Sequence, residues 1–128
     1  MAKKILVVDD EESIRKSVGF TLYLNRGFEI LEAEDGLAGL EIAKSKKPDL
    51  IISDVIMDKV NGFMMLETLR DDPQTAHIPI IMMTSHATTA GAWKSGGAVE
   101  YLEKGFSVED LLAAVDKILT VQPGDEVN

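Results

Sequence analysis

With 128 residues, 45% of them apolar and 27% charged, the chain is long enough for one globular domain with a packed core, and this composition excludes a disordered polypeptide. The formal net charge of −9 leaves no basic footprint for nucleic acid, and the absence of cysteine excludes disulfides and thiolate zinc sites. The apolar run behind residues 1–4 is too short for a signal peptide or a membrane span, so we expect a soluble, monomeric, cytoplasmic protein with no membrane partner.

Short apolar runs alternate with helix-period segments along the whole chain. In chain order the patterns predict strand 5–8, a helix to residue 26, strand 28–33, a helix after residue 36, strand 50–53, a helix after residue 62, strand 80–84, a helix within 88–97, strand 98–103 and a helix after residue 107. Strands that alternate with helices predict a parallel sheet covered on both faces, which is a doubly wound α/β fold of five strand–helix units.

Several helix ends carry recognisable signals. Ser13 is expected to cap the first helix, and Gly27 to end it. Ser107 is expected to cap the last helix, with Asp110 three residues later completing a short-armed capping box. The helix within 88–97 has the weakest pattern because its glycines and threonines lower helix propensity.

Acidic residues follow two of the predicted strands. Asp9 and Asp10 end the first strand, and Asp54 ends the third. Ligands of such sheets bind beyond the carboxyl ends of the strands, and in the strand order 2-1-3-4-5 the first and third strands are neighbours. Three carboxylates crowded there would repel one another unless a cation relieved them, and carboxylate oxygens suit Mg²⁺.

Two further strand ends contribute groups that suit a phosphoryl ligand. Thr84 ends the fourth strand and offers a hydroxyl, and Lys104 follows the fifth strand and offers an ammonium group. Neighbouring strands lie about 4.8 Å apart, so these groups can converge with the carboxylates on one small ligand.

Together these residues closely resemble the receiver domain of bacterial two-component response regulators, in particular the single-domain receivers of chemotaxis type. The matching features are the residues 7–11 (Val-Val-Asp-Asp-Glu), Asp54 with Gly62 eight residues later, Thr84, Gly97-Ala98 and residues 101–104 (Tyr-Leu-Glu-Lys). The resemblance implies a flavodoxin-like (βα)5 fold with strand order 2-1-3-4-5. It assigns residues 1–121 to the receiver domain and 122–128 to a flexible tail.

The resemblance also implies a role for each site residue. Asp54 would accept a phosphoryl group from a histidine kinase or phosphotransfer protein. Asp9, Asp10, Asp54 and the backbone carbonyl of Ile56 would bind Mg²⁺. Lys104 would pair with the phosphoryl group, and Thr84 and Tyr101 would form the switch that changes binding to a downstream protein target or relays the phosphoryl group. Such a chain catalyses its own phosphoryl transfer and is not an independent enzyme.

Three departures from the family pattern bear on these roles. Gly105 replaces the proline that usually follows the lysine through a cis bond, so we expect a trans or a strained cis Lys104–Gly105 bond. Asp58 replaces the usual proline after the phosphoacceptor, and the glycine-rich segment after Thr84, which contains Trp93, is shorter than usual.

These departures keep two alternatives open. The first is a pseudo-receiver, an interaction scaffold that phosphorylation does not switch. The second is an aspartate phosphohydrolase, which would need an acid where Ile56 stands. In a receiver, an apolar Ile56 beside the path of the attacking water predicts slow autodephosphorylation.

Overall fold

The computed structural model describes residues 2–55, 61–84 and 100–119. The strands are β1 (Lys4–Val8), β2 (Glu29–Ala33), β3 (Leu50–Asp54), β4 (Ile80–Thr84) and β5 (Glu100–Glu103), and the helices are α1 (Glu12–Arg26), α2 (Gly36–Lys46), α3 (Gly62–Asp71) and α5 (Val108–Ile118). The predicted helix within 88–97, the predicted start of the last strand at 98 and the tail 122–128 lie outside the described residues.

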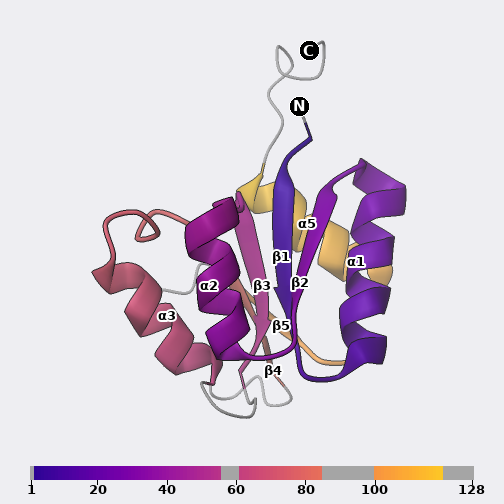
Figure 1. The fold of residues 1–128 in the computed structure, drawn as a ribbon. Helices are drawn as coiled ribbons and strands as arrows, with labels where there is room; N and C mark the ends of the chain where they lie inside the picture. The colour runs from indigo at the N-terminus through magenta and orange to yellow at the C-terminus, as the bar shows by residue number, and fades with distance from the viewer. Residues whose placement is uncertain (1, 56–60, 85–99, 120–128) are drawn as a thin grey trace.

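The five strands form one parallel sheet in the order β2-β1-β3-β4-β5, as predicted. Helices cover both faces of this sheet (Figure 1), which gives the doubly wound, flavodoxin-like architecture. One core layer packs α2 and α3 against the sheet, and the other packs α1 and α5 against its opposite face. None of the described helices has the length and apolarity that crossing a membrane requires.

Strands β1 and β3, which lead into the acidic residues, are buried on both faces. Every residue of β3 is buried, as are Ile5, Leu6, Val7 and Val8 of β1. Their side chains alternate between the two core layers, so both strands are fixed from both sides. This burial holds the carboxyl ends of β1 and β3 side by side.

Helix caps explain most of the observed helix boundaries. Gly27 ends α1 in the left-handed conformation at φ 70°, and Ser107 and Asp110 form the predicted capping box of α5. The prediction for the start of α1 is wrong, because the helix begins at Glu12 and Ser13 is not its cap. Instead, the N-cap is Glu11, two residues earlier, and the Asp9 carboxylate accepts a hydrogen bond from the Glu11 amide.

Candidate functional site: an acidic cluster at the ends of β1 and β3

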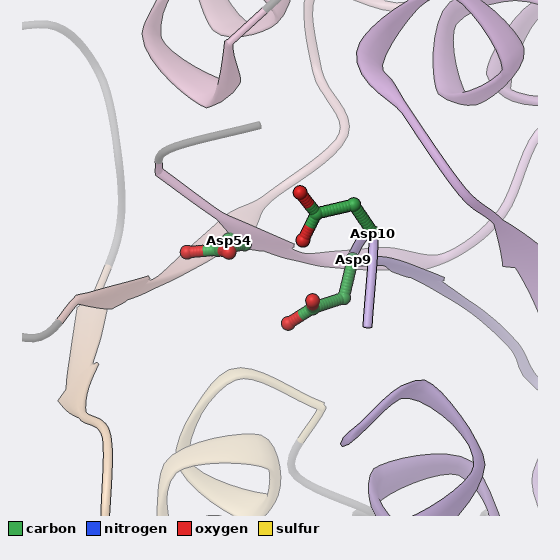
Figure 2. Close-up of side chains that lie close together, drawn as sticks. All are labelled: Asp9, Asp10 and Asp54. Atoms are coloured by element: carbon green, nitrogen blue, oxygen red, sulfur yellow. The ribbon is translucent and has the colours of Figure 1, made fainter. Parts of the chain in front are cut away.

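The structure brings together the three carboxylates that follow β1 and β3. Oxygen atoms of Asp9, Asp10 and Asp54 all lie within 4.8 Å of one another. Figure 2 shows the three side chains gathered where the turn after β1 meets the end of β3. Asp9 and Asp54 are buried, whereas Asp10 is exposed. The cluster therefore has a closed side and a side open to solvent.

Asp9 is the most deeply placed of the three acids. Its Oδ1 accepts a hydrogen bond of 2.8 Å from the Glu11 amide, while its buried Oδ2 has no hydrogen-bond partner among the described residues. Burial raises the pKa of Asp9 to about 6, and repulsion from Asp54 and Asp10 adds to this, against the opposing effects of the Glu11 amide and Lys104. Near neutral pH the folded chain therefore holds a buried, ionised carboxylate at Asp9. This charge costs folding free energy, and one of its oxygens has no hydrogen-bond partner among the described residues.

Lys104 provides the positive charge nearest to the acids. Its ammonium nitrogen lies 3.1 Å from Oδ2 of Asp54, to which it donates a hydrogen bond, and 3.8 Å from Oδ2 of Asp9. Burial lowers the pKa of Lys104, but the hydrogen bond to Asp54 and the attraction of the acids outweigh burial and raise it overall. One cation is therefore shared between two buried carboxylates.

Gly62 permits the chain to pass close to Asp54. A Cβ atom at Gly62 would overlap the carbonyl oxygen of Asp54 and would stand 3.1 Å from Cα of Val55. The Gly62 amide donates to the Val55 carbonyl at 2.8 Å, and the Ser53 hydroxyl donates to the Asp54 carbonyl at 2.9 Å. A glycine eight residues after Asp54 thus has a local physical reason.

Gly105 follows Lys104 through a trans peptide bond, one of the two outcomes expected. Its φ is 98°, a value that glycine adopts freely and that other residues rarely adopt. The prolyl ring fixes φ near about −65°, so the family's usual proline would not fit this backbone. With Gly105 in this conformation, Lys104 reaches Asp54.

The two residues expected to form the switch lie on adjacent strands. Thr84 is the last residue of β4 and pairs in register with Glu103, and its side chain is outside the described part. Tyr101, on β5, is half-buried against the core layer beneath α2 and α3. The structure places Thr84 at the same sheet edge as the acids, and Tyr101 further back along β5.

Other expectations fall on residues that the structure does not describe. These residues are Ile56, Asp58, and Trp93. The roles expected for the Ile56 carbonyl as a metal ligand and for Asp58 near the site therefore stay predictions.

Arg15 contacts the site and was not predicted from the sequence. Its guanidinium donates to the backbone carbonyl of Asp9 at 2.7 Å and to Glu32 of β2 at 3.0 Å. The available signal was weak: an arginine one turn into the helix after the acidic pair. Nothing in the sequence showed that Glu32 lies beside it, since that depends on the pairing of β1 with β2.

The donor set suits a hard divalent cation. It contains three carboxylates whose oxygens lie within 4.8 Å of one another, and one of them has a buried oxygen without a hydrogen-bond partner among the described residues. Mg²⁺ takes oxygen ligands, keeps several waters and is often held by one or two carboxylates together with phosphate oxygens. The exposed side of Asp10 leaves room for such waters, so these residues fit the ion.

Comparison with known proteins agrees with this geometry. The family model described as "Response regulator receiver domain" matches residues 5–116. Protein PilH of Pseudomonas aeruginosa is 34% identical over 119 residues, which are 91% of this chain and 97% of PilH. The DNA-binding dual master transcriptional regulator RpaA of Synechocystis is 36% identical over 118 residues, but this chain spans only about half (48%) of its length.

Solved structures give the same result at the level of the fold. The chemotaxis response regulator CheY4 of Vibrio cholerae superposes with a TM-score of 0.85 at 35% identity, covering 92% of this chain and 99% of CheY4. A family match over most of the chain, a relative aligned over nearly its full length and a shared strand order all point the same way. The chain belongs to the response regulator receiver domain family of two-component systems.

Proposed function

We propose that the chain accepts a phosphoryl group on Asp54 in a Mg²⁺-dependent reaction and thereby changes its binding to another protein or passes the group on. The observation that carries this proposal is the approach of Lys104 to Asp54 at 3.1 Å, beside carboxylates that lie within 4.8 Å of one another. The ion would be held by Asp9, Asp10 and Asp54, with the Ile56 carbonyl as a further ligand.

The chemistry of transfer follows from the charges in the site. In the reaction, the phosphorus–nitrogen bond of a phosphohistidine donor breaks, a carboxylate oxygen of Asp54 bonds to phosphorus, and the donor ring keeps the electron pair. Bound Mg²⁺ supplies positive charge that lets the anionic donor approach a carboxylate. Lys104 adds a second cation at the accepting group, and the buried surroundings strengthen its attraction for phosphoryl oxygens.

Phosphorylation of Asp54 would change the interactions of residues on β4 and β5. The new oxygens on Asp54 offer acceptors for the Thr84 hydroxyl, because β4 pairs directly with β3. Lys104 would have to exchange its present bond to the carboxylate for one to the phosphoryl group. Movement of Thr84 would change the surroundings of Tyr101, which is half-buried on the neighbouring strand β5.

The proposed boundaries and partners rest on the family. We assign residues 1–121 to the receiver domain, since the family match reaches residue 116 and α5 ends at Ile118. The phosphoryl donor would be a histidine kinase or phosphotransfer protein, and a separate protein would read the switch. Because such donors are phosphorylated from ATP, we propose that the chain works in the cytoplasm.

The experiment is to incubate the chain with acetyl phosphate and to follow its intact mass with Mg²⁺ or with EDTA. We expect one phosphoryl group per chain, only with Mg²⁺ and not in Asp54→Asn, while the control Asp71→Asn at the exposed end of α3 behaves as the wild type. No modification under any condition would instead favour the interaction scaffold. Rapid turnover of simple phosphate esters would favour a phosphohydrolase.

The lifetime of the phosphorylated state is a further expectation. An apolar Ile56 should obstruct the water that attacks the phosphoryl group, so we predict slow autodephosphorylation. Replacing Ile56 with asparagine should shorten the lifetime, measured as the decay of the phosphorylated mass after removal of acetyl phosphate. An unchanged lifetime in Ile56→Asn would count against this role.

A further inference from the structure

Arg15 links the acidic cluster to the edge of the sheet. From α1, which runs beside the edge strand β2 (Figure 1), its guanidinium donates to the Asp9 carbonyl at 2.7 Å and to Oε1 of Glu32 at 3.0 Å. The side chain is only 14% exposed, so the bridge is largely shielded from water. We propose that Arg15 is a positioning residue that sets the orientation of Asp9 and Asp10 for binding a divalent cation, and that Glu32 holds Arg15 in place.

Arg15 restrains the backbone between Asp9 and Asp10. The Asp9 carbonyl belongs to the peptide group that joins Asp9 to Asp10. The Asp9 carboxylate has a restraint of its own in the Glu11 amide. In contrast, the Asp10 carboxylate is exposed, and no hydrogen bond within the described part of the chain restrains it. The backbone therefore sets the direction in which the Asp10 side chain leaves the chain. That backbone is held by Arg15 at the Asp9 carbonyl and by the Asp9 amide, which donates to the Ala33 carbonyl at 3.1 Å.

The bridge between Glu32 and the Asp9 carbonyl requires a side chain with donors in fixed positions. A guanidinium has donors on several nitrogens in a rigid plane and can serve two acceptors at once, whereas an ammonium group is a compact charge on a flexible stem. Here Nε of Arg15 binds Glu32 and a terminal nitrogen binds the Asp9 carbonyl. Groups that orient metal ligands without touching the metal commonly change metal affinity about 10- to 100-fold when they are replaced.

Glu32 has a second partner besides Arg15. Its Oε2 accepts a hydrogen bond of 2.9 Å from Lys16, whose side chain is 59% exposed. Lys16 thus shares helix, neighbour and charge with Arg15 but makes no contact with Asp9 among the described interactions. This pair offers a matched control: loss of either cation weakens the tie to Glu32, but only loss of Arg15 releases the acidic turn.

The test measures Mg²⁺ binding by calorimetry, with unfolding in EDTA measured in parallel. We expect the dissociation constant for Mg²⁺ to rise about tenfold in Arg15→Met, less in Arg15→Lys, and less again in Glu32→Gln. Lys16→Met should bind as the wild type does. Adding Glu32→Gln to Arg15→Met should produce no further loss, because Glu32 acts through Arg15.

A positioning role also predicts how phosphorylation responds to the metal. With acetyl phosphate, Arg15→Met should be slow at low Mg²⁺ and should recover towards the wild-type rate when Mg²⁺ saturates. Equal losses of Mg²⁺ affinity in Arg15→Met and Lys16→Met would show a merely structural effect and overturn the inference.

The inference rests on the proposed Mg²⁺-dependent function, and the two fail in different ways. If the wild type bound no Mg²⁺, the proposed function and this inference would both be wrong. If the wild type bound Mg²⁺ and Arg15→Met bound it equally well, only the role of Arg15 would be wrong.

Discussion

Asp9 and Asp54 stand at the ends of the two central strands, whereas Lys104 follows the edge strand β5. The Asp9 side chain is fully buried and that of Asp54 is 9% exposed, but that of Lys104 is 23% exposed and is followed by a glycine at φ 98°. The acids are thus fixed by packing on both faces of the sheet, while the cation reaches them from its margin. This difference suits a site whose carboxylates are held in place and whose counter-charge on Lys104 comes from a more exposed side chain.

The largest effect on stability is expected at Gly62, which packs against the backbone of Asp54. Gly62→Ala should cost about 3 kcal/mol of folding free energy, because a Cβ atom would overlap the backbone oxygen of Asp54, which cannot rotate away. Urea unfolding measures this loss. The control is Gly39→Ala, whose Cβ atom would meet the side chains of Met65 and Val8 at 3.0 and 3.2 Å. Those side chains can shift, so equal losses in both variants would refute the packing argument.

Removing the cation that pairs with Asp54 should slow the chemistry. Lys104→Met should lower the rate of phosphorylation by acetyl phosphate about 100-fold, the usual effect of deleting one well-placed donor at a reacting group. The rate is read from intact mass against time. Lys117→Met is the matched control. Lys117, on α5, forms an ion pair of 3.0 Å with Glu100 on β5, the strand that precedes Lys104, and lies outside the acidic cluster. A normal rate in Lys104→Met would show that Lys104 has no part in transfer.

Removing one buried charge should strengthen the fold when Mg²⁺ is absent. Asp9→Asn should raise the free energy of unfolding in EDTA near pH 7 by about 2 kcal/mol, because it ends the cost of an ionised carboxylate whose pKa burial has raised to about 6. The amide oxygen can still accept the bond from the Glu11 amide. The same variant should lose affinity for Mg²⁺, so stability and function should change in opposite directions.

The stability gained in Asp9→Asn should become smaller as the pH falls. The pKa of Asp9 is higher in the folded chain than in the unfolded chain, so the folded state gains a proton first as pH falls through about 6. The wild type should therefore recover stability relative to Asp9→Asn. The difference in the free energy of unfolding between the two proteins should be smaller by about 1 kcal/mol near pH 5 than near pH 7. Denaturant unfolding at both pH values measures the gap, and a gap that widened on acidification would contradict the account.

The smallest effect is expected at the margin of the sheet. Gly105→Ala should cost about 1 kcal/mol through backbone strain alone, since no atom lies within 4 Å of the added methyl group. Gly27→Ala is the matched control, with φ 70° and equally open surroundings at the end of α1. Both should lose similar stability, but only Gly105→Ala should alter the phosphorylation rate. Identical rates would mean that the path of the chain after Lys104 does not matter.

Much of the fold was predictable because its signals are local. The strand at residues 80–84 has the predicted bounds, and the Ser107 cap and the Gly27 stop depend only on nearby residues. The start of α1 was not predictable from Ser13, because the bond from the Glu11 amide to Asp9 closes the preceding turn first. The order of the strands came from family resemblance and not from periodicity.

The site was predictable in its residue types and less so in its geometry. Acids after two buried strands implied a cluster, and the structure brings their oxygens within 4.8 Å of one another. The positive φ of Gly105 could not be inferred, since glycine allows either sign. Likewise, the bridge from Glu32 through Arg15 to the Asp9 carbonyl joins three elements and requires the packing of α1 beside β2.

The most direct measurement is to find which acid carries the phosphoryl group. After phosphorylation by acetyl phosphate with Mg²⁺, borohydride reduces an aspartyl phosphate to homoserine, and peptide mass spectrometry locates the converted residue. The account predicts homoserine at position 54 alone, with Asp9 and Asp10 intact and with no conversion when EDTA replaces Mg²⁺. Conversion at position 9 or 10, or conversion that does not need Mg²⁺, would contradict it.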